Sequence, residues 1–214
     1  MAPDSDRLQR LGGGALVLAG VLFLVRHVLE MTSGEPPSDG EAILAWVASR
    51  KTALSFVSET LFAATICLVP GVVALYRGLE RAHPTKAVIG CGILAVSIPV
   101  LALLLVVHGR LVYPVYGLSV STPAVAELVV AVYYGGLHAV LLLMGVATFV
   151  LSLAMQDAPY GRGVAYLGFV TGVLDVVGSY PDRIGPVSTL VCQIFFAAWF
   201  VAIGAKLLRS PPNA

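Results

Sequence analysis

Six long apolar runs, separated by short polar turns, take up most of this 214-residue chain. A helix needs about 20 predominantly apolar residues to cross the hydrocarbon core of a bilayer. A helix also satisfies its own backbone amides and carbonyls, which a bilayer cannot do. The sequence therefore predicts an all-α, polytopic transmembrane bundle of six helices. The predicted helices are 11–29, 52–76, 87–108, 124–154, 163–179 and 187–208.

The composition supports a membrane protein. Hydrophobic residues make up 58% of the chain and charged residues only 12%, whereas a soluble domain averages about 25% charged residues. Six spans fill most of residues 1–214, so a single integral membrane domain is expected. The net charge of +1 and the lack of a basic run argue against nucleic acid as a partner. Membrane lipid is the expected partner, and the oligomeric state stays open.

A short amphipathic segment precedes the second predicted span. Residues 34–40 are rich in Gly and Pro and predict a loop, and Ser38 or Asp39 can cap a helix that starts at Glu41. Residues 41–49 then predict a short helix lying in the outer membrane interface. Its apolar face consists of Ile43, Leu44, Trp46 and Val47.

The distribution of Lys and Arg predicts the orientation. With six spans both termini lie on one side, and eight of the 13 Lys and Arg residues flank that side. Short loops with more Lys and Arg stay in the cytoplasm. We therefore expect a multi-pass protein of the cell membrane with both termini cytoplasmic.

Several ionisable residues lie inside or at the ends of the apolar runs, mostly towards the outer side. Charged groups within a bilayer are costly and usually face the bundle interior or a water-filled cavity. The sequence therefore predicts a polar site in the outer part of the bundle, facing outward. These residues are Arg26, His27, Glu30, Glu59, His108, Glu127 and Asp175.

Glu59 stands out among these residues because it is the acid furthest inside an apolar run. It lies roughly 10 Å below the predicted outer end of its helix, so it needs a cationic partner or a bound proton. Arg26 and Arg110 are the nearest cations by depth, and Glu59 is expected to face the interior within reach of one of them or of a histidine. An ion pair that ties helices together, a functional acid or base, and exposure to a cavity all fit.

Further candidates come from the other predicted helices. Glu127, Tyr134 and His138 share one face of the fourth helix, and Asp175 lies about one turn below the outer end of the fifth. Hydration at the interface also explains Glu127 and Asp175, and an ordinary core histidine also explains His138. The candidate catalytic residues are Glu59, Asp175, Glu127 and His138, and the candidate substrate-binding residues are Arg26, His108, Tyr113 and Tyr134.

No metal site or cofactor is expected. Cys67, Cys91 and Cys192 lie far apart in apolar runs and fit buried small hydrophobes better than a disulfide framework. His108 and His138 differ in predicted depth, which argues against a haem held between them.

Three short motifs carry a family resemblance. They are the opening from Arg7 to Gly20, Gly136-Leu137-His138 in a Leu-rich fourth run, and Gly161-Arg162-Gly163 to Gly172 at the fifth. In these motifs, and over nearly its whole length, the chain resembles the bacterial six-helix membrane family known as domain of unknown function 4386. The resemblance implies an integral protein of the bacterial inner membrane without a settled activity, and it draws attention to His138.

Three functions fit these features. The first is a membrane enzyme that transfers protons on a small lipophilic substrate, as an isomerase or cyclase, with Glu59 and either Asp175 or Glu127 as acid and base. The second is a small proton-coupled transporter or binding protein that uses the same pocket. The third is a structural or regulatory subunit in which the charges only tie helices together.

The shape of the outer half of the bundle separates these functions. A continuous polar path past His138 to Tyr76 favours the transporter. A pocket open only outward or to lipid favours the enzyme. Complete pairing of the charges without a cavity favours the subunit.

Overall fold

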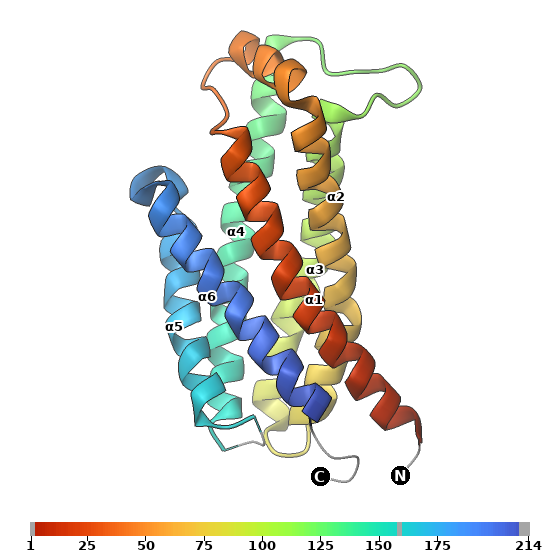
Figure 1. The fold of residues 1–214 in the computed structure, drawn as a ribbon, viewed down its shortest axis with the longest axis vertical. Helices are drawn as coiled ribbons and strands as arrows, with labels where there is room; N and C mark the ends of the chain where they lie inside the picture. The colour runs from red at the N-terminus through yellow and green to blue at the C-terminus, as the bar shows by residue number, and fades with distance from the viewer. Residues whose placement is uncertain (1–2, 158–159, 210–214) are drawn as a thin grey trace.

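The computed structural model describes residues 3–157 and 160–209, which form six helices joined by short connections (Figure 1). This confirms the predicted all-α bundle of six helices. The helices are α1 (Pro3–Ser33), α2 (Gly40–Leu79), α3 (Pro84–Val112), α4 (Pro123–Met155), α5 (Arg162–Gly178) and α6 (Pro181–Arg209).

The helices begin at residues that suit helix starts. The side chain of Asp39 accepts a hydrogen bond from the Ala42 amide at 2.9 Å, which satisfies one of the free amides in the first turn of α2. This confirms one of the two predicted caps. Pro84 and Pro123 open α3 and α4, where the missing N–H of proline costs nothing.

The predicted short helix before the second span is present as the first part of α2. Arg50 has non-helical dihedral angles (φ −123°, ψ 18°) that separate this part from the rest of the helix. In Figure 1 it lies across the top of the bundle at an angle to the rest of α2. The Trp46 indole N–H donates to the Ser33 carbonyl at 3.0 Å. The apolar side of this first part of α2 packs in a small second core with Leu54, Val112 and Ala126.

The six helices form a ring in chain order, in which α6 packs back against α1. The crossing of α1 and α6 is close because glycines face each other there. A Cβ on Gly204 would overlap the Gly13 carbonyl oxygen and lie 2.9 Å from the Val17 amide nitrogen. Small residues at such crossings let membrane helices approach closely.

Gly168 and Gly172, four residues apart in α5, also let helices approach closely within the bundle. A Cβ on Gly168 would overlap the side chains of Ser152 in α4 and Trp199 in α6. A Cβ on Gly172 would lie 3.0 Å from the Gly145 carbonyl oxygen in α4. These glycines therefore let α5 sit closely between α4 and α6.

Five of the helices in the described residues, α1 to α4 and α6, are long and apolar enough to cross a membrane. Many large side chains on the outside of the bundle are apolar, such as Phe56, Val96, Leu103 and Val173, each more than half exposed. Lipid is the environment that suits such a surface. The chain is a multi-pass integral membrane protein. Helix α5 has 17 residues, a rise of about 26 Å.

The two ends of the bundle differ. Helix α1 begins and α6 ends at the same end, which we call the terminal end (Figure 1). We call the opposite end, which carries the α1–α2, α3–α4 and α5–α6 connections, the distal end. The α5–α6 connection stops well short of the level that α2 and α4 reach there. Above this connection in Figure 1, α5 and α6 therefore do not flank α1 and α4.

Candidate functional site

A cavity of about 670 Å³ lies where α1 and α4 face the α5–α6 connection. Its walls are mainly apolar, and the large ones are Phe23, Leu61, Leu101, Leu141, Met144 and Phe196. Polar side chains from α1, α4 and α6 also reach its surface: Arg26, His27, Glu30, Tyr134, His138 and Gln193. We call this space the distal cavity.

An ion pair on α1 forms one polar edge of the distal cavity. Arg26 and Glu30 are one helical turn apart, so their side chains share a face, and Arg26 Nη2 lies 2.6 Å from Glu30 Oε2. The same nitrogen donates to the Tyr133 hydroxyl at 3.2 Å. Tyr134 of α4 lies beside Glu30. Arg26 is buried, and its Nε has no hydrogen-bond partner among the described residues.

His27 lies beside this pair on α1 and also lines the distal cavity. It is 7% exposed, and its Nε2 is buried without a hydrogen-bond partner in residues 3–157 and 160–209. A buried polar atom left unpaired costs about 1–3 kcal/mol. His27 therefore keeps a polar atom behind the cavity wall that no described residue pairs with.

His138 of α4 lines the opposite side of the distal cavity and is half-buried. Its Nδ1 lies 2.7 Å from the Ser179 carbonyl oxygen. A carbonyl only accepts, so Nδ1 carries the hydrogen, and Nε2 of the neutral ring carries the lone pair. The ring packs edge-on against Tyr180, with centroids 4.8 Å apart. The α5–α6 connection thus fixes the ring and leaves its Nε2 as an acceptor.

His108 does not reach the cavity wall. Its Nδ1 lies 2.6 Å from the Ser58 hydroxyl, and its ring packs against Tyr133 with centroids 4.4 Å apart. His108 is 2% exposed. It therefore supports Tyr133, which in turn contacts Arg26, and the structure gives it no direct access to a molecule in the cavity.

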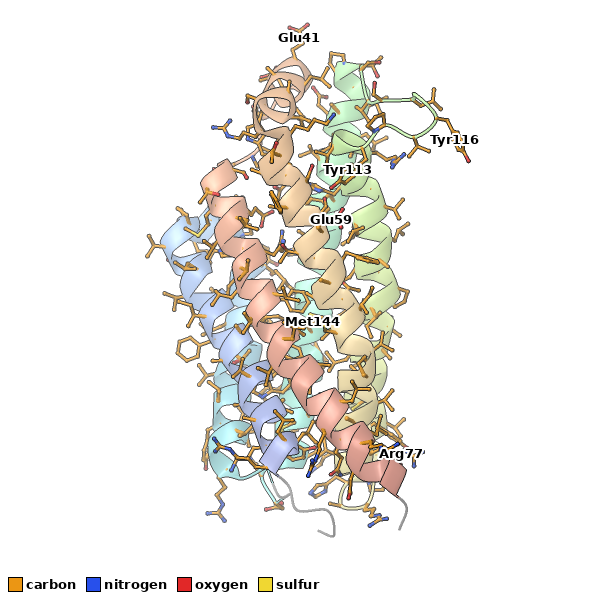
Figure 2. All side chains as sticks on the ribbon, turned by 45° about the vertical axis from the view of Figure 1, so that its right-hand side comes forward. Glu41, Glu59, Arg77, Tyr113, Tyr116 and Met144 are labelled. Carbon is orange, nitrogen blue, oxygen red and sulfur yellow. The ribbon has the colours of Figure 1, made fainter. Side chains whose placement is uncertain are left out.

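The prediction that Glu59 faces the bundle interior is wrong. Glu59 is exposed on the outside of α2, where its Oε1 accepts a hydrogen bond from the Tyr113 hydroxyl at 3.0 Å. Figure 2 shows both residues close to the distal end, further from the terminal end than Met144. The buried stripe of this part of α2 runs through Ser58 and Leu61 instead.

The surroundings of Glu59 explain how an acid is tolerated there. Together with Tyr113 it lines a shallow groove of about 400 Å³, which also contains Lys51 and Ser55. The first part of α2 lies across the distal end (Figure 1), and the rest of the helix begins after the break at Arg50, so Glu59 lies about two and a half turns from that end. For a carboxylate near the end of a bundle and beside polar groups, the free-energy cost of carrying a charge is small.

Glu127 and Asp175 do not line the distal cavity either. Glu127 is exposed, and its Oε1 accepts a hydrogen bond from the Gly40 amide at 2.7 Å. It therefore satisfies a free amide in the first turn of α2. Asp175 is 2% exposed, and within the part of the chain that the structure describes its Oδ2 has no hydrogen-bond partner. The structure does not bring Glu59, Glu127 and Asp175 together, so the predicted acid–base pairs are not assembled.

The sequence reasoning missed part of the site. Gln193 and Thr189 line the distal cavity from α6, and Ser179 and Asp182 line it from the α5–α6 connection. The sequence prediction considered mainly ionisable residues, so it did not include the amide of Gln193 or the hydroxyl of Thr189. Their spacing of four residues near the outer end of the predicted sixth helix was the available signal, because it places both on one face.

The described residues contain no group of three or more His, Cys, Asp or Glu side chains able to hold a metal ion. Comparison with protein-family models, with curated proteins and with solved structures finds no match for this chain. The resemblance to domain of unknown function 4386 stays a prediction.

Proposed function

We propose that this membrane protein binds a small lipophilic molecule in the distal cavity. The observation that carries the proposal is the cavity itself. Its volume of about 670 Å³ falls in the usual range for small-molecule sites, about 300–1,000 Å³. Such sites have mostly apolar walls and a few polar groups that fix the orientation of the ligand. The distal cavity has this composition.

The residues that line the distal cavity help to separate a proton-coupled transporter from a binding protein, an enzyme or a structural subunit. Leu61, Leu101 and Met144 line it, and Met144 lies nearer the terminal end than Glu59 does (Figure 2). Among the described residues that line the cavity, Gln193 is the polar side chain of α6 nearest the terminal end, and Tyr76 is not one of them. This favours a binding protein or an enzyme over a proton-coupled transporter. The open cavity itself also fits a binding site better than a purely structural subunit.

Proton transfer on the bound molecule is a second candidate function, and the geometry of His138 favours it. The bond from Nδ1 to the Ser179 carbonyl leaves the Nε2 lone pair available as a base. In an isomerisation the same imidazole takes a proton from one carbon and returns it to another, so no further reactant is needed. His138 replaces Glu59 as the residue proposed for this role.

We further propose that the distal end faces outward, as the Lys and Arg distribution predicts. Single cysteines at Ser38 and Ser119, both exposed at the distal end, are expected to react with an impermeant reagent in intact cells. A cysteine at Ala82, exposed in the connection between α2 and α3, is expected to react only after lysis. The unsubstituted chain reports the background from its own cysteines. Labelling at Ala82 in intact cells, without labelling at Ser38, contradicts the orientation.

Photolabelling tests the proposed binding. The protein is reconstituted in lipid nanodiscs with a fatty alcohol that carries a photoreactive group in its chain, and the labelled residues are mapped by mass spectrometry. Saturable labelling is expected at Phe23, Leu141 and Phe196 in the cavity wall. Leu103 and Val146, which are exposed on the outside, are expected to show only labelling that excess unlabelled alcohol does not reduce. Labelling confined to such outside residues contradicts the proposal.

A further inference from the structure

We infer that the ligand of the distal cavity is a long-chain amine, whose protonated amino group lies among Glu30 of α1, His138 of α4 and Gln193 of α6. The inference rests on the proposed function and adds the chemical class of the ligand. All three residues line the cavity. A protonated amino group has three hydrogen-bond donors and no acceptor, and each of these side chains offers it an acceptor.

The charge that a molecule in the cavity can reach is negative. Three carboxylates line the cavity, those of Glu30, Glu35 and Asp182, and Arg26 is the only Lys or Arg among the described residues that do so. The side chains of Glu30 and Asp182 are 19% and 76% exposed, and Glu35 is exposed. The Arg26 side chain is only 10% exposed and is paired with Glu30.

This excess of carboxylates separates the three classes of head group. An anionic head would meet all three carboxylates, and the guanidinium that could balance it is buried and already paired. An uncharged head gains nothing from the negative charge. A cationic head is attracted by the three carboxylates and repelled by Arg26, whose charge Glu30 offsets. Arg183 lies 3.4 Å from Asp182, but it is 82% exposed and does not line the cavity. Charge complementarity therefore favours a cation.

Gln193 is a buried polar side chain that has no partner. It is 8% exposed, and its amide makes no hydrogen bond within the described residues. Its atoms are not among the unpaired groups there that are fully enclosed, so the amide keeps surface towards the cavity that it lines. A buried polar group without a partner is costly, and a ligand N–H at the amide oxygen would lower that cost.

His138 offers an acceptor from α4. Its Nδ1 donates to the Ser179 carbonyl at 2.7 Å, so Nε2 of the neutral ring accepts. This nitrogen is not one of the fully enclosed unpaired atoms of the described residues either. A protonated amine can donate to it, whereas a carboxylate or an ether cannot.

The polar groups lie on the distal side of an aromatic contact. The rings of Phe23 and Phe196 are 5.4 Å apart between centroids, and both residues line the cavity. Gln193 precedes Phe196 by three residues, about one helical turn towards the distal end. Glu30 follows Phe23 by seven residues, about two turns in the same direction. An amine would therefore place its chain against the phenyl rings and its charge towards the mouth.

A matched series of ligands tests the inference. A fatty amine, the alcohol and the acid of the same chain length compete with a fluorescent fatty alcohol for the protein in phosphatidylcholine nanodiscs. At neutral pH the amine is protonated, as a lysine side chain with a pKa of about 10.4 is. It is expected to displace the fluorescent ligand at about fivefold to tenfold lower concentration than the alcohol, and the acid at a higher one. Empty nanodiscs correct for partition into lipid.

A double variant tests the charges at the mouth. Glu35→Gln with Asp182→Asn removes two exposed carboxylates, and the change costs little stability because such groups contribute little to it. The preference for the amine over the alcohol is expected to narrow to about twofold. Glu41→Gln is the control, since Glu41 is exposed at the distal end (Figure 2) but does not line the cavity. A full preference in the double variant contradicts the role of the carboxylates.

Gln193→Leu tests the contact on α6. It keeps the approximate size of the side chain and removes the amide, so the affinity for the amine is expected to fall about fivefold. No hydrogen bond within the described residues is lost, so the melting temperature in detergent is not expected to fall. An unchanged affinity for the amine in this folded variant overturns the contact.

The outcomes of the ligand series separate the two proposals. Equal displacement by the amine and the alcohol, or stronger displacement by the acid, overturns the amine and leaves the binding of a lipophilic molecule intact. Loss of fluorescent-alcohol binding when phosphatidylethanolamine is added to the nanodiscs assigns the site to a lipid headgroup and overturns the free amine. Absence of any saturable binding overturns the proposed function as well.

Discussion

Replacing Glu30 by alanine is expected to lower the free energy of unfolding by about 3–5 kcal/mol. The change strands Arg26, whose side chain is 10% exposed and whose Nη2 lies 2.6 Å from the Glu30 carboxylate. The hydroxyl of Tyr133 would remain as a partner of that nitrogen, but a neutral hydroxyl does not balance a buried charge. Melting temperature in detergent, compared with the unsubstituted protein, measures the loss.

Two further variants separate this loss from a general loss of packing. The double variant with Glu30→Ala and Arg26→Met is expected to recover part of the stability, because no charge is then left buried and unpaired. Glu80→Ala breaks the pair of Arg77 and Glu80 at the terminal end, where the Arg77 side chain is 62% exposed. That control is expected to change stability by less than about 1 kcal/mol. A Glu30→Ala variant as stable as the Glu80→Ala variant contradicts the role given to the α1 ion pair.

The number and order of the helices could be predicted because the bilayer sets the length of an apolar run. The ends could not be predicted as well, since a helix continues through polar residues as long as its backbone is satisfied. Helix α1 covers Pro3–Ser33, whereas the apolar run covers 11–29. In α2 the amphipathic segment and the span form one nearly continuous helix that breaks only at Arg50.

The candidate site was predicted in part. The shared face of Tyr134 and His138 on α4 places both in the cavity wall, together with Arg26 of α1. Depth alone misplaced Glu59, because depth does not tell which face of a helix a side chain takes. Residue 59 lies about 100° around the helix from Ser58, which is buried. The cavity depends on where the α5–α6 connection stops relative to α1 and α4, and this follows from tertiary packing.

Filling the distal cavity is expected to abolish binding. Leu141 of α4 is half-buried and lines the cavity, so Leu141→Trp places an indole ring in the space that the ligand would occupy. The affinity for a lipophilic ligand is expected to fall on the order of a hundredfold, about 2.7 kcal/mol. The side chain has room to enter the cavity, so a large loss of folding stability from overpacking is not expected.

The matched control lies on the same helix. Val146 is 52% exposed on the outside of α4 and does not line the cavity. Val146→Trp adds the same ring against lipid and is expected to leave both affinity and melting temperature unchanged. Comparing the two variants therefore shows whether an effect requires an indole in the cavity or follows from any added indole on α4.

Equilibrium binding of a fluorescent fatty alcohol to these three proteins in nanodiscs tests the central claim most directly. Saturable binding to the unsubstituted protein and to Val146→Trp, with the loss of binding in a folded Leu141→Trp protein, is the result that the distal cavity predicts. The same affinity in all three proteins, or no saturable binding in any of them, would contradict it.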